Sequence, residues 1–103
     1  MSKVHYRYVF GPSVALEEVE GSLVLALFAE ESLHGEDQVH LDAAHYLDTD
    51  GRTCVIDAGT EVGRDLNRVF TGFLRREFGA DAFTVERLDG AGTAEARDAP
   101  ARV

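Results

Sequence analysis

Apolar side chains recur at helical spacing over residues 60–79, and this is the clearest pattern in the chain. Thr60 is a suitable N-cap residue and Gly79 is typical of a helix C-terminus, so both ends of the helix are marked. The apolar positions form one wide stripe, which consists of Val62, Leu66, Val69, Phe70, Phe73, Leu74 and Phe78. We expect this stripe to cover a sheet. Phe73→Ala should then cost about 3–5 kcal/mol of stability, and Arg75→Ala well under 1 kcal/mol.

A second helical pattern covers residues 14–34, with Ser13 as the expected N-cap and Gly35 just after the last turn. Gly21 lies inside this pattern and costs about 1 kcal/mol relative to alanine. An alternative therefore stays open, in which residues 14–19 form a short strand and the helix begins later.

Four stretches read as strands because β-branched, aromatic and aliphatic residues alternate with polar ones; they are residues 3–10, 39–48, 52–58 and 82–88. Asp50-Gly51 separates the middle two and is a strong hairpin signal. A two-residue loop there would place Leu47 opposite Cys54 and His45 opposite Ile56.

The elements follow in the order β-α-β-β-α-β. Right-handed crossovers send both helices to the same face of one sheet. We therefore expect an α+β, two-layer α/β sandwich of the ferredoxin-like split βαβ type, with an antiparallel sheet in the order 4-1-3-2. Residues 1–88 should form one domain. Residues 89–103 contain small and charged residues without an apolar run, so we expect a disordered C-terminal tail.

Charge changes the picture because it is unevenly placed. The chain of 103 residues has a formal net charge of −9, and residues 8–51 hold ten acids and no lysine or arginine. Such an acidic chain argues against nucleic-acid binding. The acidic half serves either as a solvated surface or as a docking surface for a basic partner.

The arginines gather on the outer side of the second helix, as Arg64, Arg68, Arg75 and Arg76. We expect them to face water or the acidic first helix, in exposed pairs worth about 0–1 kcal/mol each.

One cysteine, no evident secretory signal and no long apolar run together favour a cytoplasmic protein that does not enter a membrane.

The face of the sheet opposite the helices should be uncovered. It mixes polar groups with aromatic and aliphatic ones, which suits a partner surface. We expect partner binding to involve His5, Arg7, His40, Asp42, Tyr46, Val55 and Asp57.

The same face holds the best candidate for metal binding or catalysis. His40 and Asp42 would lie on one side of a strand, near His5 and Asp57, and these are possible Zn²⁺ or Mn²⁺ ligands. No zinc motif is matched, so ordinary surface polar groups are the favoured interpretation, and we expect no metal or other cofactor.

Three further motifs have a structural interpretation that is favoured over a chemical one. Cys54 and His45 would lie on the same face of the hairpin, and a thiolate beside an imidazole is the nucleophile arrangement of cysteine enzymes. That face should be buried, however, where a cysteine usually behaves as a small apolar side chain. Asp48-Thr49-Asp50-Gly51 resembles the start of a calcium loop but lacks its distant glutamate, so a tight turn is favoured. Gly59 and Gly63 flank a helix start that could hold an anion, yet the P-loop ending is missing.

The leading hypothesis is a non-enzymatic protein–protein interaction or accessory domain, which acts through its open sheet face or as a homodimer. Two alternatives stay open. One is a regulatory domain that senses a small molecule. The other is a small enzyme or metal-binding protein that uses the His40, Asp42 and Asp57 face.

Overall fold

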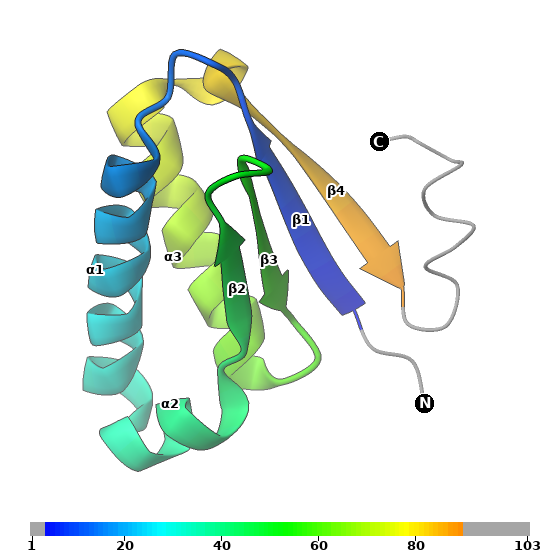
Figure 1. Ribbon diagram of the computed structural model, residues 1–103. Helices are drawn as coiled ribbons and strands as arrows, with labels where there is room; N and C mark the ends of the chain where they lie inside the picture. Colours follow the sequence, from blue (N-terminus) through cyan, green and yellow to red (C-terminus); the bar gives the residue numbers. More distant parts are fainter. Residues whose placement is uncertain (1–3, 90–103) are drawn as a thin grey trace.

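The computed structural model describes residues 4–89, which form an α+β fold with a four-stranded antiparallel open sheet and three helices (Figure 1). The strands are β1 (Val4–Phe10), β2 (His45–Asp48), β3 (Thr53–Asp57) and β4 (Phe83–Asp89). The helices are α1 (Leu16–His34), α2 (Glu36–Asp42) and α3 (Glu61–Phe78), and a 3₁₀ turn, η1 (Ala80–Ala82), precedes β4. Within residues 4–89, no helix combines the length and apolar character needed to cross a membrane.

The strands lie in the order β2-β3-β1-β4, which is β4-β1-β3-β2 when read from the other edge. The hairpin register is confirmed, because Leu47 pairs with Cys54 and His45 pairs with Ile56. The loop is longer than expected, since residues 49–52 form a turn of four residues. Arg52 closes this turn with a positive φ of 58°, and its guanidinium donates to the carbonyl oxygens of Gly11 and Val14.

Helices α1 and α3 pack on one face of the sheet, and Figure 1 shows the opposite face without a helix over it. Between the layers lies the core, whose fully buried side chains include Tyr8, Ile56, Leu66 and Phe70. Tyr8 reaches across the layers, because its hydroxyl hydrogen-bonds Asn67 and Thr71 of α3.

The helix predicted over residues 60–79 is confirmed. Thr60 is its N-cap, and its hydroxyl accepts a hydrogen bond from the Gly63 backbone N–H at 3.0 Å. Gly79 ends it with a φ of 88°, a conformation that favours glycine. The stripe is buried most deeply at Leu66, Phe70 and Leu74, which have no exposed surface, whereas Phe73 is only half-buried.

The first helix begins two residues later than predicted, at Leu16, and its N-cap is Ala15. Ser13 therefore does not cap it. The reason is that Val14 is buried in the core and its backbone belongs to a turn, in which its N–H donates to the Gly11 carbonyl. The alternative strand over residues 14–19 is wrong, because helix α1 already begins at Leu16 and covers residues 16–19.

The strand predicted over residues 39–48 is wrong in its first half, where α2 forms instead. Val39 is buried and Leu41 is 79% exposed, so these side chains do not share a face as they would in a strand. The burial in this segment follows the helical spacing of three and four residues better than the strand spacing of two. Val39 and Ala43 point inward together, and Gln38 donates to Asp42 one turn later at 2.6 Å.

The last strand extends one residue beyond the predicted domain limit of residue 88, since Asp89 pairs with Val4. The rest of the predicted tail, residues 90–103, lies outside the described residues.

Candidate functional site

Five of the seven predicted partner-binding residues lie on the open face of the sheet. In the pairing register Tyr46 lies beside Val55, and Val55 lies beside Arg7. His5 pairs with Asp57 one step further along the same face. Arg7 also makes a 3.0 Å ion pair with Glu86 of β4, which ties this face to the far edge of the sheet.

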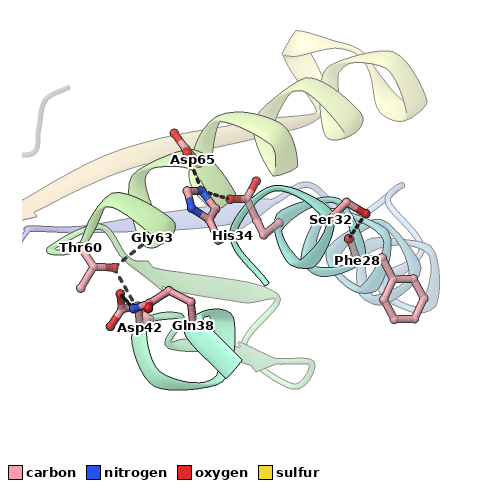
Figure 2. A network of polar contacts seen from close by, with 9 residues as sticks. Phe28, Ser32, His34, Gln38, Asp42, Thr60, Gly63 and Asp65 are labelled. Carbon is pink, nitrogen blue, oxygen red and sulfur yellow. Dashed lines mark hydrogen bonds and ion pairs between the residues drawn. The ribbon is translucent and has the colours of Figure 1, made fainter. Parts of the chain in front are cut away.

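The other two, His40 and Asp42, do not belong to this face, because both lie on helix α2. His40 is exposed and faces Glu36 one turn earlier, at 3.9 Å. The carbonyl of Asp42 accepts a hydrogen bond from the Thr60 hydroxyl, which joins the end of α2 to the start of α3 (Figure 2). The predicted cluster of His5, His40, Asp42 and Asp57 is therefore not assembled on one strand face.

Two depressions flank the edge strand β2, one on each side of the sheet. The depression on the open face has a volume of about 210 Å³ and is lined by His5, Ala44, His45, Tyr46, Val55 and Asp57. The second, between β2 and α1, has a volume of about 240 Å³ and is lined by Glu20, Leu23, Val24, Leu27, His45, Tyr46 and Leu47. His45 and Tyr46 line both, so the two depressions meet at the β2 edge.

The β2 edge is accessible on its outer side. β2 pairs only with β3 among the described strands, and Tyr46 is 66% exposed. Ala44 accepts a hydrogen bond from the Asp57 N–H, and backbone groups alternate in direction along an antiparallel strand. His45 and Leu47 therefore direct their backbone N–H and C=O groups away from β3.

Electrostatics at this edge are set by acids and by partial burial. Residues 8–51, which include all of α1, α2 and β2, contain no lysine or arginine. Partial desolvation lowers the pKa of His45. The edge therefore presents apolar surface and negative charge.

The residues of the remaining predicted motifs have structural roles. The Gly63 N–H donates to Thr60, and the Gly59 N–H donates to Asp57 at 2.8 Å, so both donors of the possible anion site are used. Asp48 accepts from the Gly51 N–H at 3.0 Å, as expected for a tight turn. Cys54 has no exposed surface, and burial raises the pKa of its thiol to about 12, which disfavours the reactive thiolate.

The arginines of α3 are exposed, and within residues 4–89 none of them forms an ion pair with α1. The pair that does join the two helices is His34 with Asp65, at 2.9 Å.

A second cluster of titratable side chains, formed by Glu30, His34 and Asp65, was not predicted from the sequence. Glu30 is fully buried between α1 and α3, close to His34 and Asp65. Desolvation raises the pKa of Glu30, the nearby Asp65 charge adds to this effect, and His34 opposes it. The available signal was the spacing: Val19, Leu23, Ala26 and Glu30 recur at four and three residues, so an acid continues an apolar face.

No protein-family model matches the chain, and a search of curated proteins finds no significant match.

Proposed function

We propose that this chain is a protein-interaction domain whose β2 edge accepts an extended segment of a partner protein as an additional strand. The strand order and the two large helices on one face support the ferredoxin-like split βαβ architecture, with α2 inserted ahead of β2. In this architecture β2 is an edge strand that remains open to pairing.

The observation that carries the proposal is the pair of depressions meeting at β2. Successive side chains of a strand point to opposite faces of a sheet. A segment added beside β2 would place alternate side chains in the α1–β2 depression and over the open face. The backbone groups of His45 and Leu47 would supply the pairing hydrogen bonds, which is how strand addition gains affinity, while the pockets provide specificity.

The lining residues define the chemistry of the segment. Leu23, Val24, Leu27 and Leu47 make the α1–β2 depression apolar, which suits valine, isoleucine or leucine. The absence of cations in residues 8–51 favours basic residues at the alternate positions. We therefore propose a segment in which apolar and basic residues alternate.

A second copy of the chain is a poorer occupant of the same edge. Pairing β2 with β2 would bring two acidic halves together, with ten acids and no lysine or arginine in residues 8–51 of each copy. Repulsion between like charges disfavours that arrangement. A small molecule is also a poorer occupant, since each depression is smaller than the roughly 300–1,000 Å³ typical of ligand pockets.

The test is a binding titration with a synthetic peptide of alternating valine and lysine, monitored by NMR on the isotope-labelled chain. We expect the amide signals of His45–Asp48 to shift. The same peptide with N-methyl groups on alternate residues should not bind, because it cannot pair with the strand. A scrambled peptide of equal charge controls for nonspecific attraction.

Matched variants locate the site. Val24→Arg adds a cation inside the α1–β2 depression and should weaken peptide binding at least tenfold, about 1.4 kcal/mol. Leu33→Arg is the control, because Leu33 is on the same helix and 70% exposed but does not line the depression.

Equal loss of binding in both variants, or shifts confined to residues outside β2, would contradict strand addition. Concentration-dependent dimerisation with β2 at the interface would show that a second copy is the occupant. A thermal-shift response to an amino acid or nucleotide would favour small-molecule sensing instead.

A further inference from the structure

Glu30 is an acid in a position that the helix otherwise fills with apolar residues. Its side chain has no exposed surface, like those of Val19 and Ala26 on the same face of α1. Within residues 4–89, neither of its carboxylate oxygens has a hydrogen-bond partner. A buried carboxylate that lacks hydrogen bonds is costly, so its presence needs a compensating group.

Two other possible metal ligands face this carboxylate. Oε1 of Glu30 lies 3.4 Å from Nε2 of His34, one helical turn later. The same His34 nitrogen lies 2.9 Å from Oδ2 of Asp65 on α3, and Figure 2 shows these two side chains reaching toward each other between the helices. One ligand atom from each of the three residues lies within 4.8 Å of the others.

We propose that Glu30, His34 and Asp65 bind a divalent transition-metal ion of the Zn²⁺ class, with water as the fourth ligand. The ligand set is one imidazole nitrogen and two carboxylate oxygens, which suits zinc in a site with three protein ligands. Mg²⁺ and Ca²⁺ instead prefer six or more oxygen ligands. A charge of +2 would balance the two carboxylates and supply the partner that Glu30 lacks.

The distances between the side chains are compatible with this ion. Ligand atoms placed tetrahedrally at the usual zinc distances lie about 3.3 Å apart, close to the separations of 3.4 and 2.9 Å at His34. The ion would replace the hydrogen bond between His34 and Asp65. It has a route from solvent, because the side chains of His34 and Asp65 are 19% and 31% exposed.

A proton is the competing occupant of the cluster. An imidazolium between two carboxylates would also reduce the repulsion, without any metal. Cobalt distinguishes the two, because Co²⁺ in a tetrahedral site with nitrogen and oxygen ligands absorbs visible light much more strongly than Co²⁺ in water.

The experiment uses the full chain, produced without a histidine tag and stripped of metal. We expect Co²⁺ to give a saturable visible absorption at one ion per chain, and Zn²⁺ to displace it and raise the melting temperature. Glu30→Gln and Asp65→Asn should each weaken Zn²⁺ binding by more than about 100-fold, beyond the loss expected for a merely supporting residue.

Helix α2 offers a matched control. Glu36 and His40 have the same four-residue spacing as Glu30 and His34, at 3.9 Å, but both are more than 70% exposed. Glu36→Gln and His40→Ala should leave Zn²⁺ affinity within about twofold of the original value, since exposed pairs contribute little.

Loss of folding is separable from loss of binding. Glu30→Gln removes a buried charge and keeps the shape of the side chain, so the metal-free variant should melt at the same temperature or higher. The proposal is overturned if the unaltered chain binds neither ion. It is also overturned if Glu30→Gln binds Zn²⁺ normally, or if His40→Ala weakens binding as much as Asp65→Asn does.

Discussion

Tyr8 and Cys54 show how burial changes the chemistry of single residues. Both side chains have no exposed surface, and desolvation raises the pKa of each to about 12. The tyrosine hydroxyl is satisfied by Asn67 and Thr71, so it links the sheet to α3. Cys54 behaves as a small apolar side chain, in agreement with the sequence-based interpretation of its strand.

These two pKa shifts predict how stability depends on alkaline pH. The folded state favours the neutral forms, so their contribution is fully present below the ordinary pKa values of 9.0 for Cys54 and 10.0 for Tyr8. It should be lost as the pH rises toward 12, with a slope of about 1.4 kcal/mol per pH unit for each group. Urea unfolding at pH 8, 9, 10 and 11 measures this decline.

Cys54→Ala isolates the thiol contribution. In this variant the free energy of unfolding should begin to fall near pH 10 instead of pH 9, because Tyr8 is the one of the two groups that remains. Parallel stability curves for the variant and the original chain between pH 9 and pH 10 would show that the thiol does not contribute.

At the scale of the element, α3 is the part of the chain that the sequence describes best, yet its most important side chain is not the one first expected. Phe70 is fully buried and makes an edge-to-face contact with Tyr8, with ring centroids 5.1 Å apart. Phe73 is half-buried. Periodicity defines the apolar stripe but not which member lies at its centre.

The stability ranking along α3 follows from this burial. We now expect Phe70→Ala to cost about 3–5 kcal/mol and Phe73→Ala to cost less than that. Arg75→Ala is the control, at well under 1 kcal/mol, because its side chain is exposed. Urea midpoints of the three variants check the order, and a larger loss for Phe73 than for Phe70 would contradict it.

Two glycines of α3 provide a matched comparison. A Cβ at Gly63 would collide with the backbone carbonyl oxygen of Asp57, whereas a Cβ at Gly72 would meet nothing within 4 Å. Gly63→Ala should therefore destabilise the fold, because the start of α3 must move away from β3. Gly72→Ala should stabilise it by roughly 0.5–1 kcal/mol, through helix propensity.

Thermal and urea unfolding of the two alanine variants measure the difference. Similar effects of both substitutions would show that α3 does not approach the end of β3 as closely as the structure indicates.

At the scale of the whole molecule, charge and exposed apolar surface coincide. The acidic half of the sequence forms α1, α2 and β2, and the large exposed apolar side chains also lie there. They are Val24, Leu25, Phe28, Leu33, Leu41 and Tyr46. This coincidence favours a partner that is both apolar and basic. The proposed docking edge uses residues 20–27 of α1, and the proposed metal cluster uses Glu30 and His34, further along the same helix.

Local sequence patterns predicted the structure correctly where the residues allowed only one plausible interpretation. The caps at Thr60 and Gly79 and the hairpin register are of this kind. Local patterns failed at residues 36–42. The side chains there fit a strand, in which every second residue shares a face, and they also fit a short helix, in which residues three and four apart share a face. Tertiary contacts stabilise the helix, because in the helical form Val39 is buried and the carbonyl of Asp42 accepts a hydrogen bond from Thr60.

The candidate sites were harder to predict, because each combines residues from distant elements. Of the residues predicted for partner binding, those on β1, on β3 and at Tyr46 lie on the open face as expected, whereas His40 and Asp42 lie on α2. Partner binding by these residues stays a prediction. The α1–β2 depression depends on how the helix lies across the sheet edge, which periodicity does not specify. The Glu30 cluster depends on Asp65, which is 31 residues from His34 along the chain.

The sequence by itself determined the α+β class, the α3 helix with its two caps, the hairpin register and the acidic half, because these follow from spacing and composition along a short stretch. Only the tertiary structure decided that α2 is a helix, that Phe70 lies at the centre of the core, and that Glu30, His34 and Asp65 meet. Those facts depend on packing between segments far apart in the chain, where burial and satisfied hydrogen bonds outweigh local preference.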